Sequence, residues 1–576
     1  HLFHCERLRF LFRCSTLFTF SKLKVLMLEH LLGFERWWEI DERQEEQTIF
    51  PVLEKLFISH CGKLVALPEA PLLQGPCGEG GYTLVRSAFP ALKVLKLKDL
   101  ESFQRWDAVE ETQGEQILFP WLEKLLVKDC PQLIDLPEAP LLQEPCSEGG
   151  YRLVRSAFPA LKVLKMKCLG SFQRWDAVEG PLFPRLEKLS VENCPKIKDL
   201  PEAPNLSVLK IVDGKQEIFH CVDKYLSSLT NLTLMLEYTS ILPVDSKEKW
   251  NHKSPLTVVK IGCCNSFFGP GALEPWEYFV HLEKLEIYRC DVLVHWPEKV
   301  LQSLVSLRTL VIRNCENLTG YAQAPLEPLT SERCELESLC LQNCPSLVEM
   351  FNVPTSLKKM DIRWCIKLES IFSKQQGMSD LVQGSSSSEA VMRATVSELS
   401  SSPVNHFFPC LEDLYSFACG SLPAVLNLPL SLKALEIDGC NSIQVLSCQS
   451  GGLQKPEVTT SISRSPIMPE PAATTTAIEH LFPPHLESLV IRDCAGMLGG
   501  TLCLPAPLKR LGIIGNSGLT SLECLSVEHP PSLEELELKS CCTLAFLPNE
   551  PQVYRSLLFL IIRGCPAIKK LPRCLW

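Results

Sequence analysis

The sequence lacks two features, each of which would place it in a large class of proteins. It has no run of about 18 apolar residues, so no segment is expected to cross a bilayer. It also has no excess of basic charge, because 57 Lys and Arg stand against 67 Asp and Glu and the net charge is −10. A nucleic-acid-binding protein needs a concentrated basic surface. We therefore expect neither a membrane span nor a nucleic-acid partner.

Signatures of catalysis and of metal binding are also missing. No segment matches the phosphate-binding loop G-x-x-x-x-G-K-[ST], the zinc motif H-E-x-x-H, the nucleophile motif G-x-S-x-G or the redox motif C-x-x-C. The 12 histidines show no ligand spacing, and the adjacent pairs Cys263-Cys264 and Cys541-Cys542 are too close to complete a tetrahedral metal site alone. We expect no catalytic, metal or cofactor site in this chain, and therefore no enzyme.

What the sequence does contain is a recurring run L-x-x-L-x-[LIV], followed three residues later by cysteine. Clear examples are Leu122-Leu125-Val127-Cys130 and Leu533-Leu536-Leu538-Cys541. A repeat of about 20–30 residues with this pattern is the signature of leucine-rich repeats. The first leucine of each run, used here as the repeat marker, falls at residues 23, 53, 92, 122, 161, 186, 206, 229, 256, 282, 307, 336, 357, 411, 432, 486, 508, 533 and 557.

This pattern predicts an α/β leucine-rich-repeat solenoid, or horseshoe. Each run should form a short strand whose alternate residues face inward, and neighbouring strands should pair into a long parallel sheet on the concave face. The rest of each repeat is too short and too rich in proline for a long helix. We expect it to return over the convex side mostly as loop or as short 3₁₀ or helical turns.

The whole chain, residues 1–576, is expected to form one solenoid domain of about 19 irregular repeats, the first of them truncated. A segment at 77–109 recurs at 146–178, an offset of 69 residues that indicates an internal duplication. Ser-rich residues 373–406 and Ser/Thr/Pro-rich residues 447–481 are expected to be disordered inserts, because they cannot bury enough apolar surface. Since the chain begins at His1 within a partial repeat, we also expect it to be part of a longer protein.

One position of the repeat holds 13 of the 28 cysteines. Equivalent positions of successive repeats are stacked in a solenoid, and free cysteine is a small and readily buried residue. We therefore predict a structural ladder of buried free thiols in a reducing compartment, rather than disulfides or metal ligands. The residues are Cys61, Cys130, Cys194, Cys264, Cys290, Cys315, Cys344, Cys365, Cys419, Cys440, Cys494, Cys541 and Cys565.

The residues around the end of each strand should project from the concave face. From residue 282 onward these positions are rich in arginine and aromatic residues, the types that dominate binding hot spots. Arg289, Arg313, Arg363, Arg492, Lys539 and Arg563 should form a basic strip that could steer an acidic partner, although an exposed face needs polar residues in any case. The candidate partner-binding residues are Tyr288, Arg289, Arg313, Gln342, Arg363, Trp364, Arg492 and Arg563.

The recurring unit F-P-x-L-E-K-L-x-[IV]-x-x-C-P-x-[LI]-x-x-L-P, as in 119–137 and 183–201, resembles the irregular repeats of plant intracellular immune receptors. These are the coiled-coil, nucleotide-binding, leucine-rich-repeat disease-resistance proteins of the cereal type. The resemblance implies a domain that binds a pathogen effector or a guarded host protein. It also implies that the domain holds an upstream nucleotide-binding module inactive, in the cytoplasm or the nucleus. ADP or ATP would bind only in that module.

Two other classes of protein remain open. A substrate-binding repeat domain of an F-box ubiquitin ligase also uses cysteine-containing repeats, but those are more regular and have a helical segment after the cysteine. An extracellular receptor ectodomain would carry Asn in place of the ladder cysteine and a G-x-I-P segment, which this sequence lacks. The sequence upstream of His1 would decide, because a nucleotide-binding module, an F-box and a signal peptide each select one class.

Overall fold

The computed structural model describes most of the repeats and divides into two compact units. The first unit contains His1–Cys290 and Ser303–Ser306, and the second contains Asp291–Gln302 and Leu307–Trp576. The described residues are 1–14, 20–40, 50–68, 72–77, 81–106, 119–137, 141–145, 151–173, 175, 183–214, 218–236, 254–263, 276, 278–296, 301, 303–320, 335–350, 354–371, 408–448, 482–494, 496–526 and 528–575.

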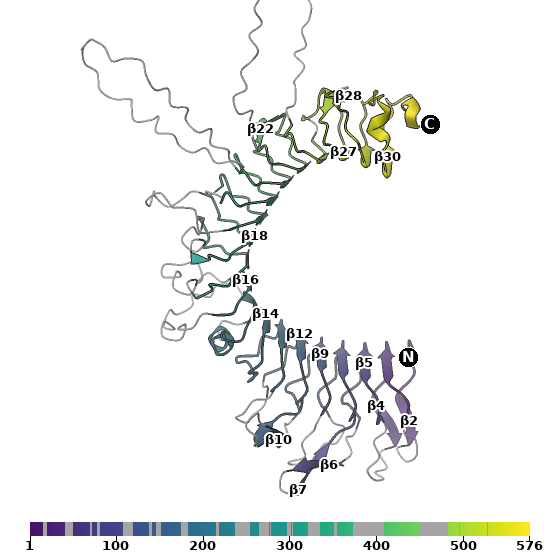
Figure 1. Cartoon of the computed structure of the whole chain (residues 1–576). Coiled ribbons are helices and arrows are strands. Elements are labelled where there is room, and N and C mark those ends of the chain that lie inside the picture. The colour runs from purple at the N-terminus through teal and green to yellow at the C-terminus, as the bar shows by residue number, and fades with distance from the viewer. Residues whose placement is uncertain are drawn as a thin grey trace, which may run out of the picture. The chain divides into compact units, whose positions relative to one another are not determined.

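Both units are built on one element, a short strand that pairs in parallel with the strand of the next repeat (Figure 1). The described residues include 20 strands of this sheet. In the first unit they are β1 (Leu2–Phe3), β3 (Val25–Glu29), β5 (Lys55–Ser59), β8 (Val94–Lys98), β9 (Lys124–Lys128), β12 (Val163–Lys167), β13 (Lys188–Glu192), β14 (Val208–Gly214), β15 (Asn231–Leu236), β16 (Val258–Gly262) and β17 (Lys284–Tyr288).

The second unit continues the same pattern. Its strands are β18 (Thr309–Arg313), β19 (Ser338–Gln342), β20 (Lys359–Arg363), β21 (Asp413–Phe417), β23 (Ala434–Asp438), β25 (Ser488–Arg492), β27 (Arg510–Ile514), β29 (Glu535–Lys539) and β30 (Phe559–Arg563). Each of the 19 marker leucines lies two residues before the first residue of one strand. The predicted leucine-rich-repeat solenoid with a long parallel sheet is thereby confirmed.

The strands form where they do because inward leucines alternate with polar residues. In β9, Leu125 and Val127 are buried while Lys124, Leu126 and Lys128 lie on the other face. The register carries this alternation from repeat to repeat, since Leu125 pairs with Leu95 of β8. Because side chains alternate with a period of two, a slip of one residue would bury lysine and expose leucine. The hydrophobic pattern therefore sets the register of the whole sheet.

The return segments contain little helix among the described residues. The helical pieces are α1 (Phe219–Val222) and the 3₁₀ turns η3 (Asp223–Tyr225), η6 (Pro551–Tyr554) and η7 (Arg573–Leu575). Short parallel pairs, which the sequence pattern did not predict, also occur: β2 (Phe10–Cys14) with β4 (Arg36–Ile40), β22 (Val425–Leu428) with β24 (Val445–Cys448), and β26 (Gly500–Leu504) with β28 (Leu519–Cys524).

The internal duplication is visible in the structure as two copies of one hairpin. β6 (Leu72–Cys77) pairs with β7 (Gly81–Arg86), and β10 (Leu141–Pro145) pairs with β11 (Tyr151–Arg155), both in antiparallel register. The two hairpins are offset by the same 69 residues as their sequences and extend away from the main sheet (Figure 1). Each copy folds alike because a repeat unit makes its contacts within itself and with its neighbours only.

Aromatic residues fill the core opposite the sheet in the first unit. The phenylalanines of the F-P-x-L motif stack, with ring centroids 5.3 Å apart for Phe119 and Phe158 and 6.2 Å apart for Phe158 and Phe183. Trp37 is 3% exposed, and its indole N–H donates to the carbonyl of Ala66 at 3.0 Å. Trp106 and Trp175 make equivalent bonds to the carbonyls of Asp135 and Asp199. These tryptophans pack between repeats, with their one polar group satisfied.

The cysteine position faces the core in every described repeat that has one. Cys61, Cys130, Cys194, Cys290, Cys315, Cys344, Cys365, Cys419, Cys440, Cys494 and Cys541 are buried and free, Cys565 is half-buried, and Cys264 lies outside the described residues. The thiols of Cys61, Cys130 and Cys194 each donate to the carbonyl of the last strand residue, two positions earlier, at 3.4 Å. A small weak donor thus satisfies the carbonyl at the turn.

Burial of these thiols predicts that the protein loses stability in alkali. It raises the pKa of Cys130 to about 12 and that of Cys61 and Cys541 to about 11, from an ordinary value of 9.0. A raised folded-state pKa means that the stabilisation is complete below pH 9 and is lost as the pH rises toward 12. For Cys130 the loss is at most about 4 kcal/mol.

The measurement is the urea midpoint of unfolding at a series of pH values, with thiolate absorbance followed in parallel. We expect thiolate absorbance to appear together with unfolding. Cys130→Ala should flatten the dependence on pH above 9. Full thiolate formation in a chain that remains folded would contradict the prediction.

Both predicted inserts fall outside the described residues. Residues 373–406 lie wholly outside them. Of residues 447–481, only the first two are described, and they complete β24. The prediction that the inserts are disordered is therefore untested.

Candidate partner-binding face

The first, third and fifth residues of each strand point to the face of the sheet opposite the leucine core. In β17 these are Lys284, Glu286 and Tyr288, and all three are half-buried. Because the strands pair in register, equivalent residues of successive repeats form three rows across this face. The rows are called the first, third and fifth rows below, and together they form the exposed sheet face.

The residue directly after the fifth row has a left-handed backbone conformation. It does so for 19 of the 20 strands, and the exception is Leu236 of β15, which is buried and does not have a positive φ. Most of these residues are Asp, Asn, His or Gly, which tolerate positive φ. Sequence reasoning counted this position with the exposed sheet face, yet its composition reflects a turn. The recurrence of Asp, Asn, His and Gly before the ladder cysteine was the signal for it.

Two of the candidate binding residues violate that preference. Arg289 has φ of 49° and Trp364 has φ of 58°, a region that costs large side chains about 1–2 kcal/mol. Strain of this kind often marks functional positions. Trp364 is also 48% exposed, so burial does not compensate the strain.

Trp364 belongs to a cluster on β20 and β21 in the second unit. The Arg363 guanidinium donates to both carboxylate oxygens of Asp361, at 2.8 and 2.9 Å, and lies 4.5 Å from the ring centroid of Tyr415. The Trp364 and Phe417 rings meet edge to face at 4.8 Å. We call Asp361, Arg363, Trp364, Tyr415 and Phe417 the aromatic–arginine cluster. It combines a preorganised cation with one exposed and two half-buried aromatic rings, residue types that are enriched at protein-binding hot spots.

The other candidates of the second unit lie in the fifth row at different distances from this cluster. Gln342 pairs in register with Arg363, and Arg313 pairs with Gln342, so these residues adjoin it. Arg492 ends β25, separated from β20 by β21 and β23, and Arg563 ends β30. The structure therefore brings together Arg313, Gln342, Arg363 and Trp364.

Three of the six residues of the expected basic strip form ion pairs with carboxylates. Arg363 pairs with Asp361, Arg492 with Glu436 and Lys539 with Glu537. These carboxylates belong to the third row. The sequence analysis did not consider this row, although a period of two places its side chains on the same face as the fifth row. The strip therefore carries less free charge than its arginines and lysine suggest.

In the first unit, Tyr288 and Arg289 border a shallow groove on the exposed sheet face. The Arg289 guanidinium lies 5.4 Å from the centroid of the Tyr288 ring. The groove has a volume of about 630 Å³ and is lined by residues of β14 to β17, including Lys210, Met235 and Lys260. Its floor is mixed in polarity, which suits a protein surface better than a small apolar ligand.

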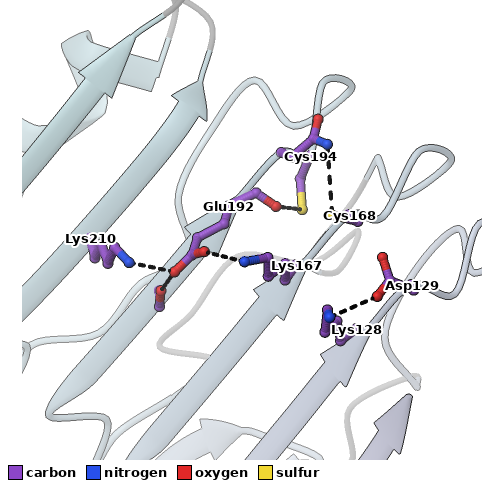
Figure 2. Close-up of polar contacts among 9 residues, drawn as sticks. Lys128, Asp129, Lys167, Cys168, Glu192, Cys194 and Lys210 are labelled. Atoms are coloured by element: carbon purple, nitrogen blue, oxygen red, sulfur yellow. Dashed lines mark hydrogen bonds and ion pairs between the residues drawn. The ribbon is translucent and has the colours of Figure 1, made fainter. Parts of the chain in front are cut away.

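Lysines dominate the exposed sheet face of the first unit, and carboxylates compensate some of them. Glu192 accepts from Lys210 at 2.6 Å and lies 3.2 Å from Lys167, while Lys128 lies 3.1 Å from Asp129 (Figure 2). Burial would raise the pKa of the Glu192 carboxyl. The hydrogen bonds and charges of Lys210 and Lys167 outweigh burial and hold that pKa below its usual value.

The described residues offer no grouping of three or more His, Cys, Asp or Glu side chains that could hold a metal ion. In the same residues, no helix is long and apolar enough to cross a membrane. The geometry of the exposed sheet face is that of an extended surface. Such surfaces on repeat proteins bind other proteins.

Comparisons with known proteins found a relative in sequence and solved structures with similar repeats. No protein-family model matches the sequence. A probable disease resistance protein, RF9, from Arabidopsis thaliana is 28% identical over 191 residues, which cover 27% of this chain and 17% of that protein. The alignment thus spans about a sixth of that relative.

Solved structures with similar repeats were also found. The circular leucine-rich-repeat protein CroV588 has a TM-score of 0.40 and 14% identity, covering 91% of this chain and 62% of its own. YopM from Yersinia enterocolitica has a TM-score of 0.31 and 16% identity, covering 88% and 89%. The chain is a leucine-rich-repeat protein similar in sequence to a plant disease-resistance protein.

Proposed function

We propose that this chain is the recognition and autoinhibitory domain of an intracellular plant immune receptor. It binds a pathogen effector or a guarded host protein through the exposed sheet face. Without that partner it holds an upstream nucleotide-binding module inactive, and ADP or ATP binds in that module. The similarity to a disease-resistance protein supports this assignment over an F-box ligase substrate domain.

The observation that carries the proposal is the aromatic–arginine cluster. An exposed tryptophan in a strained backbone conformation lies beside an arginine whose guanidinium is fixed by Asp361 and Tyr415. Fixing the arginine before binding lowers the entropy cost of the complex. Trp364 contacts Phe417 but stays 48% exposed, so its packing in the isolated chain is incomplete. A protein partner that covers the cluster supplies the missing burial.

The proposal is tested by a two-hybrid screen of the chain against host and pathogen libraries, followed by retesting with charge-reversal variants. Arg313→Glu combined with Arg363→Glu should weaken binding of the true partner by at least about tenfold, with little change in thermal midpoint. Arg313 is exposed and ends β18, so its reversal disturbs no core contact.

The matched control is Arg185→Glu combined with Arg555→Glu. Both arginines are exposed, lie outside the strands of the sheet and carry the same charge. This pair should retain the partner. If the two pairs behave alike, or if the Arg313 and Arg363 variant unfolds, the cluster is not the recognition site.

A further inference from the structure

Three adjacent strands of the first unit carry an unusual concentration of one charge. β8, β9 and β12 place nine side chains on the exposed sheet face, and none is acidic. Six are lysines: Lys96, Lys98, Lys124, Lys128, Lys165 and Lys167. The other three are Val94, Leu126 and Val163. We call these nine residues the lysine grid.

In the first and third rows of the grid, the register places charged and apolar side chains alternately on neighbouring strands. In the first row Lys124 lies between Val94 and Val163, and in the third row Leu126 lies between Lys96 and Lys165. The fifth row consists of Lys98, Lys128 and Lys167. Neighbouring strands are about 4.8 Å apart, so like charges face one another at a cost in stability. An unbound grid of this kind is electrostatically unfavourable.

Among the described residues, only the fifth-row lysines of the grid form ion pairs with carboxylates. Lys98, Lys128 and Lys167 lie 3.2, 3.1 and 3.2 Å from Asp99, Asp129 and Glu192 (Figure 2 shows the last two pairs). Lys96, Lys124 and Lys165 are exposed and have no ion pair among the described residues. Lys96 instead lies 4.7 Å from the centroid of the Phe57 ring. Therefore no carboxylate in the described part of the chain forms an ion pair with these three lysines around Leu126.

A hollow beside the grid adds an apolar contact. It has a volume of about 390 Å³ and is lined by Met27, Phe57 and Leu126 together with Lys96 and Lys98. The acidic residue of the lining, Glu29, lies 2.9 Å from the His1 ring. An apolar side chain of a partner could enter it while flanking carboxylates reach the lysines. The positive charge of the grid and the apolar lining of the hollow therefore suit a ligand that has both carboxylates and apolar side chains.

From this arrangement we propose that the lysine grid binds an acidic polypeptide segment that also carries apolar side chains. Its carboxylates pair with Lys96, Lys124 and Lys165, and its apolar residue packs on Leu126. A nucleic acid fits less well, because Asp99, Asp129 and Glu192 border the grid and repel phosphates, and because none of the nine side chains is aromatic for base stacking. The inference rests on the proposed function, since it names a second contact of a protein-recognition face.

The experiment uses the full chain and a fluorescein-labelled peptide of glutamates with interspersed leucines, followed by fluorescence anisotropy. Binding should weaken as the salt concentration rises, because exposed charges are screened. Lys96→Gln, Lys124→Gln and Lys165→Gln combined should raise the Kd at least about tenfold. The thermal midpoint should stay or rise, because repulsion is relieved. Leu126→Asn should also weaken binding of the leucine-containing peptide.

Matched controls separate this surface from general charge. Lys367→Gln, Lys569→Gln and Lys570→Gln remove the same charge from exposed lysines of the second unit and should leave the Kd unchanged. A peptide with glutamine in place of glutamate should not bind. Equal losses in both triple variants, or tighter binding of single-stranded oligo-dT than of the peptide, would overturn the inference.

The two proposals fail separately. If the lysine triple variant still binds the peptide but Arg313→Glu with Arg363→Glu loses the screened partner, only the lysine grid is refuted. If the lysine triple variant loses the peptide while the arginine variant keeps the partner, the cluster on β20 and β21 is refuted.

Discussion

Cys344→Arg is expected to unfold the repeats around β19. Cys344 is 0% exposed, and its thiol faces the carbonyl of Gln342 at 3.7 Å. A guanidinium at this position would be a buried charge without a carboxylate partner, which costs about 3–5 kcal/mol before the larger volume is accommodated. Because each repeat is stabilised by its neighbours, the loss should be local.

Hydrogen exchange is the measurement that resolves this effect. The amides of β18, β19 and β20 should lose protection in Cys344→Arg, while those of β27 to β30 keep theirs. Cys344→Ser, which keeps a small donor, should cost only about 1–2 kcal/mol.

Cys542→Arg is the matched control, because Cys542 follows a ladder cysteine directly but is exposed. It should leave exchange unchanged. If Cys344→Arg and Cys542→Arg were equally well tolerated, the buried-thiol ladder would be wrong.

The positions of 19 of the 20 described strands of the main sheet could be predicted, because a period of two and a recurring leucine suffice to place a strand. Even the weakly marked strands β14, β15 and β16 begin two residues after Leu206, Leu229 and Leu256. The short pairs β2–β4, β22–β24 and β26–β28 were not predicted. They depend on how the returns of neighbouring repeats align, and no single segment contains that information.

The sequence predicts which face of the sheet carries the candidate site, but it does not predict which charges on that face are paired. Sequence spacing put Arg363 and Arg492 in one row. Their partners Asp361 and Glu436 belong to another row, and Glu436 lies on a different strand from Arg492. Ion pairing between rows depends on register and rotamer, which a repeat pattern does not specify.

The lysine grid was missed for a related reason. Across the sequence, basic and acidic residues of the first unit are mixed, and the net charge is negative. Only the folding of β8, β9 and β12 separates six lysines onto one face, where Lys96, Lys124 and Lys165 form no ion pair with a carboxylate of the described residues. The charge of a surface is thus a property of strand alternation, which overall composition conceals.

Trp364→Asn is expected to weaken partner binding about thirtyfold while the fold remains as stable as before. Asparagine tolerates positive φ, and it occupies the equivalent position after β18 and β19 as Asn314 and Asn343. Relief of backbone strain, about 1–2 kcal/mol, should offset the lost edge-to-face contact with Phe417, about 0.5–1.5 kcal/mol.

Loss of an exposed tryptophan at a hot spot costs about 2 kcal/mol or more of binding free energy, or about thirtyfold in Kd. Calorimetric titration with the screened partner measures the Kd, and urea unfolding measures stability. Trp121→Asn, at a 63% exposed tryptophan outside the sheet, should change neither quantity, and Trp276→Asn, at a 0% exposed one, should unfold its repeat. If Trp364→Asn lost stability as Trp276→Asn does, Trp364 would be a structural residue. If it kept both stability and affinity, the strain at φ of 58° would have no role in recognition.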